Sequence, residues 1–100
     1  MQLANKRKGS SLTVMLTGEL DHHNAADIRE TLDSMLDGSV RELILDMSGV
    51  TFMDSSGIGI VLGRYRRMQK RDGRLYLSGL GGSAEKILRM AGVLGLVERK

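Results

Sequence analysis

The chain contains no cysteine and no proline, and few of its residues are aromatic. Without cysteine there can be no disulfide, no thiolate metal site and no cysteine nucleophile, so we expect a reducing, cytoplasmic compartment. Aromatic residues make up only 3% of the chain, which nearly excludes stacking platforms for single-stranded nucleic acid. No apolar run approaches the ~20 residues that a membrane helix needs, and the first ten residues lack the apolar stretch of a signal peptide.

The length and charge of the chain are those of an ordinary small domain. Its 100 residues, 41% of them hydrophobic, are enough for one domain with a core. A net charge of +3 is too small to indicate nucleic-acid binding by itself. We therefore expect a single domain, residues 1–100, that binds neither nucleic acid nor a membrane directly.

Hydrophobic periodicity predicts alternating strands and helices. Strands are expected at Gln2–Asn5, Leu12–Thr17, Val40–Met47, Arg74–Ser78 and Leu94–Val97, with Ser48–Met53 a loop or partial strand. The first of these has the weakest pattern and is followed by a turn at Lys6–Ser10. Helices are expected from the N-cap Asn24 to the stop at Gly38, at Ser56–Lys70, and from the N-cap Ser83 to Gly92. Apolar stripes at helical spacing predict buried positions at Ile28, Leu32, Met35 and Leu36, at Ile58, Val61, Leu62, Tyr65 and Met68, and at Ile87, Leu88 and Met90.

The element order β(β)αβαβαβ predicts an α/β fold with a mixed, mostly parallel sheet of four to five strands. In such a sheet the loops that follow the carboxyl ends of parallel strands lie on one edge of the molecule. Gly18–His23 follows one strand and Val50–Ser56 follows another. We therefore expect Asp21 and the segment Asp54-Ser55-Ser56 to share an edge, which is the candidate functional site.

Two adjacent serines precede the predicted helix at this edge. In the simplest interpretation one of them caps the helix and the other packs. A phosphoserine is the functional alternative, since its charge would meet free N–H groups and the positive end of the helix dipole. Phosphorylation would then change the surface without unfolding the domain. The residues alone do not distinguish Ser55 from Ser56.

Other chemistries at this edge are less well supported. A Ser/His/Asp hydrolase would use His22 or His23, but the chain lacks the G-x-S-x-G elbow. The same histidines with Asp21 would make a metal site, although two adjacent histidines are more often part of a solvated loop. Glycines within the next helix, at 57, 59 and 63, do not have the spacing of a dinucleotide fingerprint. Their cost to helix stability favours close packing against the sheet or a partner.

Basic residues gather near the end of the second predicted helix, at Arg64, Arg66, Arg67, Lys70, Arg71 and Arg74. Cations there complement the helix dipole and solvate the outer face, which is the simpler interpretation. An electrostatic contact with an acidic partner is the alternative.

Four segments, Leu16–His23, Phe52–Gly59, Gly63–Tyr65 and Met90–Val93, resemble the anti-sigma factor antagonists of spore-forming bacteria, which are single STAS domains. The resemblance extends over roughly Leu12 to Leu96 and is greatest to members of the forespore sigma-F sporulation pathway.

The resemblance implies that the unphosphorylated chain binds an anti-sigma factor and releases the sigma factor. In the family that anti-sigma factor is also a serine kinase, which phosphorylates the Ser directly after the motif Asp, Ser55 here, and a serine phosphatase reverses the modification. The resemblance implies that the chain is a substrate rather than an enzyme and carries no metal or cofactor. The ATP for the modification is bound by the partner kinase. The acceptor environment and docking surface would comprise Asp21, Asp54, Ser56, Gly57, Ile58 and Gly59.

Two expectations remain open at this stage. A STAS module that senses a nucleotide or small molecule in another signalling or transport assembly is the alternative function, since one fold hosts several roles. Family members usually carry another helix after the final strand, whereas this chain ends at Lys100. We expect a monomer, with dimers as the alternative if the patch left without that helix pairs with itself.

Overall fold

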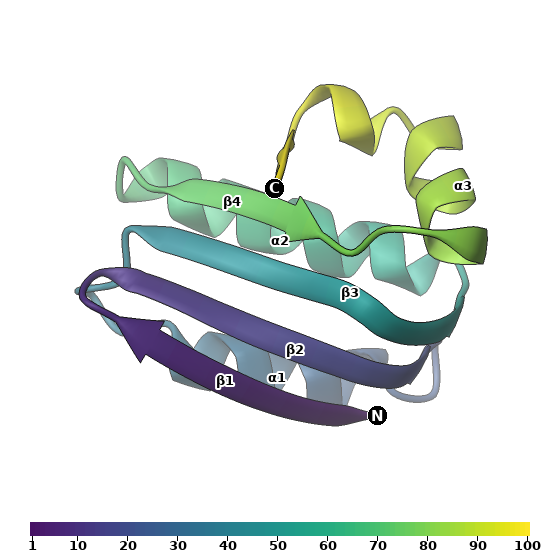
Figure 1. The fold of residues 1–100 in the computed structure, drawn as a ribbon, viewed down its shortest axis with the longest axis horizontal. Coiled ribbons are helices and arrows are strands. Elements are labelled where there is room, and N and C mark those ends of the chain that lie inside the picture. The colour runs from purple at the N-terminus through teal and green to yellow at the C-terminus, as the bar shows by residue number, and fades with distance from the viewer.

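The structure, a computed structural model, describes all 100 residues as one sheet with helices packed on one face (Figure 1). The elements are β1 (Gln2–Lys8), β2 (Ser11–Leu20), α1 (Ala25–Met35), β3 (Glu42–Met53), α2 (Ser56–Lys70), β4 (Arg74–Ser78), α3 (Gly82–Met90), a 3₁₀ turn (Val93–Gly95) and β5 (Glu98–Arg99). The strands follow the order β1-β2-β3-β4-β5, with β1 antiparallel to β2 and all other neighbours parallel. The predicted mixed, mostly parallel sheet is therefore confirmed. No helix has the length and apolar character needed to cross a membrane.

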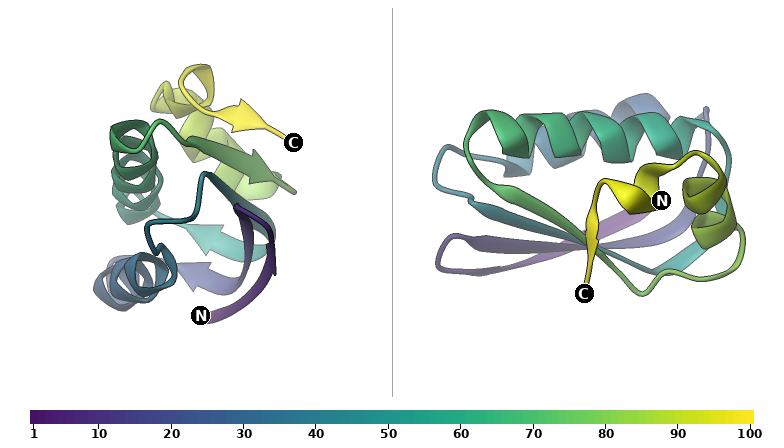
Figure 2. Two further views of the ribbon diagram at one scale, coloured as in Figure 1. Left: turned by 90° about the vertical axis from the view of Figure 1, so that its left-hand side faces the viewer. Right: turned by 90° about the horizontal axis from the view of Figure 1, so that it is seen from above.

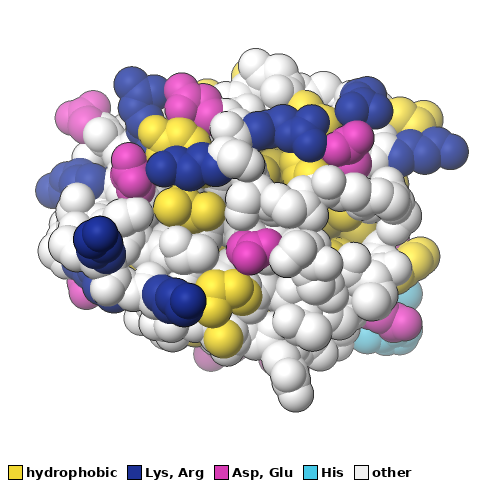
Figure 3. Space-filling view, viewed as in Figure 1, with side chains coloured by type: hydrophobic (Ala, Val, Ile, Leu, Met, Phe, Trp, Pro, Cys, Tyr) yellow, Lys and Arg dark blue, Asp and Glu magenta, His cyan; other side chains and the backbone are white.

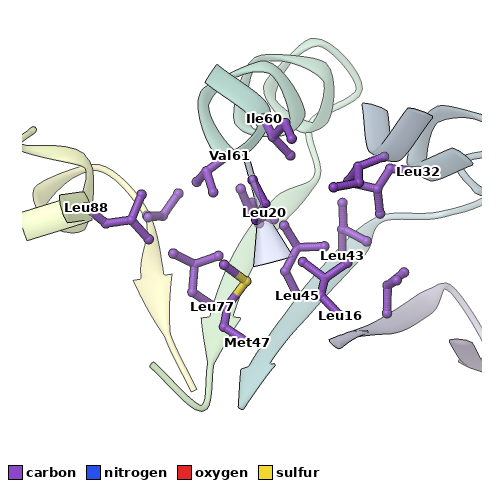
Figure 4. Close-up of a cluster of buried hydrophobic side chains, with 14 of the residues drawn as sticks. Leu16, Leu20, Leu32, Leu43, Leu45, Met47, Ile60, Val61, Leu77 and Leu88 are labelled. Carbon is purple, nitrogen blue, oxygen red and sulfur yellow. The ribbon is translucent and has the colours of Figure 1, made fainter. Parts of the chain in front are cut away.

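The core lies between the sheet and the helices. Helices α1 and α2 lie side by side on one face, α3 covers the end of the sheet near β3 and β4, and no helix covers the opposite face (Figure 2). Because side chains alternate along a strand, every second residue of the parallel strands points toward the helices. Figure 4 shows strand residues meeting residues of all three helices, among them Leu16, Leu45, Leu77, Leu32, Ile60 and Leu88, which are almost fully buried.

Only β4 has the predicted bounds, and among the other strands β2 continues past its predicted end to Leu20. Strand β1 continues to Lys8, which shortens the predicted turn to Gly9 and Ser10. Strand β3 continues through the predicted loop to Met53, since β2 keeps pairing with it across two register shifts. The predicted final strand Leu94–Val97 is wrong. That segment follows a left-handed Gly92 into the 3₁₀ turn, and the strand that pairs with β4 is Glu98–Arg99.

The helices also present different faces from those predicted. The N-cap of α3 is Gly81 rather than Ser83, and Met90 is 78% exposed rather than buried. On α2 the predicted residues Ile58, Leu62 and Tyr65 only border the core. Ile60 on α2 is buried instead, because the helix turns the face that begins at Gly57 toward the sheet.

A buried ion pair joins α1 to α2. Arg64, predicted to lie on a solvated basic surface, is only 4% exposed, and its Nε lies 3.1 Å from Oδ1 of Asp33. The two groups are close but not aligned as a hydrogen bond, and Nη1 of Arg64 has no partner in the chain. Burial lowers the pKa of the Arg64 guanidinium, and the Asp33 carboxylate partly offsets that effect. The charge of Arg64 therefore depends on Asp33 for compensation.

Three more residues of the predicted basic cluster contact groups of the chain itself. Arg67 approaches the same Asp33 oxygen at 3.5 Å, and Arg71 donates a hydrogen bond of 2.6 Å to the carbonyl of Asp37. Arg74 pairs with Glu98 at 3.1 Å. These side chains mostly connect elements of the chain itself.

Removing Asp33 is expected to destabilise the fold more than removing the whole ion pair. Asp33→Ala leaves the Arg64 charge buried without compensation and should cost about 2–3 kcal/mol. The double variant Asp33→Ala/Arg64→Met should regain most of that loss, because it removes the buried charge. Urea unfolding of the three proteins measures both values. Equal stability of the single and double variants would contradict this account.

Candidate functional site

The loops after β2 and β3 meet at one edge of the sheet, as predicted. The backbone N–H of Asp54 donates to the carbonyl of Leu20 at 3.2 Å, which ties the end of β3 to the end of β2. Oδ2 of Asp54 accepts a hydrogen bond of 3.1 Å from the backbone N–H of His22. Asp54 therefore connects the loop that precedes α2 to the loop that precedes α1.

Asp54 also caps α2. Its Oδ1 accepts a hydrogen bond of 2.8 Å from the backbone N–H of Ser56, the first residue of the helix. Ser55 occupies the N-cap position but makes no side-chain capping bond. The interpretation in which a serine hydroxyl caps this helix is therefore wrong, because the carboxylate of Asp54 makes the capping bond instead.

The two serines differ in exposure. Ser55 is exposed, and neither its hydroxyl nor its backbone N–H has a hydrogen-bond partner in the chain. Ser56 is half-buried, and its N–H is bound by Asp54. The N–H groups of Gly57 and Ile58 bind the carbonyls of Asp54 and Ser55. The expectation of free N–H groups at this helix end therefore holds for Ser55 alone.

Asp21 organises the start of α1. Its Oδ1 accepts hydrogen bonds from the backbone N–H groups of His23 at 3.0 Å and Asn24 at 3.1 Å. Asn24 is the N-cap residue as predicted, but its side chain makes no capping bond and donates instead to the carbonyl of Glu19 at 2.8 Å. Both helices at this edge thus begin beside an aspartate that binds backbone N–H groups.

The histidines lie in a solvent-exposed loop. The ring of His22 stacks on that of His23 with centroids 4.0 Å apart, and Nδ1 of His22 lies 3.4 Å from Oδ2 of Asp54. His22 thus faces a carboxylate rather than the hydroxyl of a serine, which is not the arrangement of a Ser/His/Asp hydrolase. No group of three His, Asp or Glu side chains converges in a way that would hold a metal ion.

Gly57 allows α2 to sit directly on the ends of β2 and β3. A Cβ at this position would lie 2.6 Å from Cγ and Sδ of Met53 and 3.0 Å from Cδ2 of Leu20. At Gly59 and Gly63 a Cβ would meet no atom within 4 Å. The predicted close packing of helix glycines against the sheet therefore applies to Gly57 alone, while Gly59 is exposed next to Ile58, which borders the core.

The edge is acidic. Residues 17–24 and 50–60 contain Glu19, Asp21 and Asp54 but no Lys or Arg. Figure 3 shows the two histidines at one end of the open sheet face, beside an acidic group. The pKa of Asp54 is lowered, chiefly by the N–H of Ser56 and further by that of His22, although partial burial opposes the shift. The sequence indicated Asp54 as part of the site, but not that its carboxylate binds both loops.

Comparison with known proteins identifies the family of the chain. The model of the STAS domain matches residues 2–99. The anti-sigma F factor antagonist of Paenibacillus polymyxa is 30% identical over 97% of this chain and 84% of its own length. That of Lysinibacillus sphaericus is 36% identical over 83% of this chain and 72% of its own length. The solved structure of the Bacillus cell fate determinant SpoIIAA in the phosphorylated form superposes with a TM-score of 0.76 at 29% identity, covering 99% of this chain and 91% of that one.

The chain therefore belongs to the STAS domain family. Its resemblance to anti-sigma factor antagonists, which rested on a few short segments, is confirmed over most of the chain, since relatives of that name match 83–97% of it.

Gly57→Ala is expected to destabilise the domain by about 1–3 kcal/mol, because Met53 must move to accommodate the added methyl group. Gly63→Ala, in the same helix but with open space around the new Cβ, should stabilise it by up to about 1 kcal/mol. Thermal unfolding of the two variants measures the difference. Destabilisation of similar size in both would mean that helix propensity, rather than contact with the sheet, decides the effect.

Acid should remove the stabilising contribution of Asp54. Because its folded pKa lies below that of the unfolded chain, the carboxylate stabilises the fold above pH ~4 and loses that contribution as the pH falls through the folded pKa. The difference in unfolding free energy between the wild type and Asp54→Asn should therefore be constant near neutral pH and shrink below pH ~4. Denaturant unfolding at several pH values measures it.

Asp37 provides a positive control for this measurement. Hydrogen bonds from Ser39 lower its pKa to about 2, so the corresponding comparison with Asp37→Asn should also converge in acid. If the curves converge for Asp37 but stay parallel for Asp54, the two backbone hydrogen bonds do not favour the ionised form of Asp54.

Proposed function

We propose that the chain is an anti-sigma factor antagonist whose unphosphorylated form binds an anti-sigma factor and thereby releases the sigma factor. The anti-sigma factor acts as a serine kinase that inactivates the chain by phosphorylating Ser55, and a serine phosphatase reactivates it. The single observation that carries this proposal is the state of Ser55, an exposed hydroxyl without internal partners at the start of a 15-residue helix. The names of the relatives support the partner, and the phosphorylated form of SpoIIAA supports the modification.

Ser55 is a better acceptor than Ser56 for physical reasons. In the transfer, the Ser55 hydroxyl gives its proton to a base of the kinase, and its Oγ bonds to the γ-phosphorus of ATP held by the kinase. The bond from that phosphorus to the β–γ bridging oxygen breaks, and ADP leaves with the bonding electron pair. The hydroxyl has no internal hydrogen bond to break, and the residue is open to an approaching active site. Ser56 is half-buried, and its backbone is fixed by Asp54. We therefore place the modification at Ser55 and treat Ser56 as part of its surroundings.

The fold can accept the added charge. A phosphoryl group on Ser55 would lie at the positive end of the α2 dipole and next to the unbound N–H of its own residue. The capping bond of Asp54 to Ser56 holds the helix start without help from the hydroxyl of Ser55. We therefore expect the modified chain to remain folded.

Phosphorylation would end the association at the surface. An interface that packs against the neutral hydroxyl of Ser55 would have to bury nearly two negative charges after the modification, which costs free energy because those charges lose their water. The neighbouring carboxylate of Asp54 adds repulsion to the phosphoryl charge. In our proposal Asp21, Asp54 and the exposed start of α2, with Ile58 and Gly59, form the surface that docks on the anti-sigma factor. The chain itself binds no ATP, metal or nucleic acid in this scheme and acts in the cytoplasm as a monomer, in the sporulation sigma-factor pathway of its organism.

Incubation with the anti-sigma factor of the same organism and ATP should add one phosphoryl group to the chain. Ser55→Ala should abolish labelling, whereas Ser56→Ala, the matched control, should retain it. Ser55→Asp should weaken binding to the anti-sigma factor by about tenfold or more, because a fixed charge reproduces part of the phosphate. Intact mass with site mapping and a binding titration measure these outcomes.

Full labelling of Ser55→Ala would contradict the assignment of the acceptor. Tight nucleotide binding by the chain alone, with no labelling by the kinase, would instead favour a STAS module that senses a small molecule.

A further inference from the structure

One large apolar side chain is exposed within the segments that form the site. The exposed large apolar residues of the chain are Phe52 at 46%, Met90 at 78% and Leu96 at 55%. Met90 ends α3 and Leu96 follows the 3₁₀ turn, whereas Phe52 lies two residues before Asp54. Phe52 is also the only phenylalanine in the chain.

The register of the sheet decides where Phe52 points. Strand β3 contains extra residues at two register shifts, after which Leu20 pairs with Met53 and Glu19 with Phe52. Leu20 and Met53 are both buried against the helices. Since neighbouring side chains alternate, Glu19 and Phe52 point away from the helices, toward the open side of the sheet.

On the side of β4, no strand pairs with the last residues of β3, whereas β2 pairs with them as far as Met53. The pairing of β3 with β4 ends where Asp46 meets Ser78, and β3 runs on to Met53. In Figure 1 the end of β3 lies between the end of β2 and α3, at the side of the molecule that holds the site. Phe52 therefore lies on the open side of the sheet, directly before the loop that carries Ser55.

The groups around Phe52 indicate the kind of partner surface that would complement it. Its neighbour in the register is the carboxylate-bearing Glu19, and the site segments contribute no basic residue. An apolar pocket with a basic side chain at its rim complements an exposed ring beside a carboxylate. Isolated apolar residues on a surface are ordinary, but this one is continuous with the surface that the proposed function requires.

We propose that Phe52 is the aromatic anchor through which the chain docks on the anti-sigma factor kinase, with the ring in an apolar pocket of the partner and Glu19 facing a basic side chain at its rim. This inference rests on the proposed function. An aromatic anchor buries a large area with few rotatable bonds, and such residues dominate many interfaces. Bound there, Phe52 holds Ser55 at the active site of the kinase without touching the transferred phosphoryl group.

Phosphorylation kinetics with Phe52→Ala test this role. Loss of an anchor should raise KM by about tenfold or more and leave kcat unchanged, because the anchor binds substrate and transition state equally. Met90→Ala and Leu96→Ala, which remove comparably exposed apolar groups elsewhere, are the matched controls and should leave KM unchanged. An unchanged KM for Phe52→Ala, or an equal rise in all three variants, would overturn the inference.

The single phenylalanine permits a second measurement that needs no substitution. With phenylalanine labelled selectively, the ring gives one set of NMR signals, which should shift or broaden when the anti-sigma factor is added. Ring signals that stay unchanged while the complex forms would overturn the inference. Self-association is the other outcome that would overturn the inference. In that case the ring signals and the sedimentation of the chain alone would change with its concentration, and Phe52→Ala would have the same KM as the wild type.

The same experiments separate this inference from the proposed function. If the wild-type chain is phosphorylated at Ser55 and Phe52→Ala has the same KM, only the anchor fails. If the wild-type chain neither binds the anti-sigma factor nor accepts phosphate from it, the proposed function fails and the anchor fails with it.

Discussion

The site depends on one carboxylate. Asp54 accepts a hydrogen bond from the first residue of α2 and another from His22 in the loop before α1. A single side chain thus fixes the start of one helix and the distance between two loops that are 32 residues apart. Because the carboxylate of Asp54 carries out the capping, the hydroxyl of the adjacent Ser55 has no partner within the chain. That free hydroxyl is the physical basis for the acceptor role proposed for Ser55.

Packing on one side of the sheet holds this edge in place. Gly57 brings α2 against Met53 and Leu20, and the Asp33–Arg64 pair joins α2 to α1 farther along the helices. The helices that begin at the site are therefore constrained along their lengths by the core and by a buried charge pair. A modification at the exposed start of α2 can change the surface while this packing persists. The opposite face of the sheet carries no helix, and there the end of β3 presents Phe52.

Membership of the STAS family and the geometry of the edge support each other. The family comparison establishes the fold over residues 2–99, and relatives of known name connect it with anti-sigma factors. The structure adds a difference between two adjacent serines, since Ser55 is exposed and Ser56 half-buried. The proposed function joins these findings, and the proposed anchor extends the docking surface from the helix start to the end of the neighbouring strand.

Patterns along the chain were enough to predict the order of strands and helices, the mostly parallel sheet and the edge on which Asp21 and Asp54 lie. These features follow from local periodicity and from the geometry of parallel strands, which do not depend on distant contacts. Three-dimensional contacts were needed to show that Arg64 is buried, that Asp54 rather than a serine caps α2, and that Met90 is exposed. Burial and hydrogen bonding depend on which distant groups come together, and a periodic pattern along one helix or loop does not contain that information. The two register shifts that turn Phe52 outward belong to the same class, because a strand reveals an extra residue only against its neighbour.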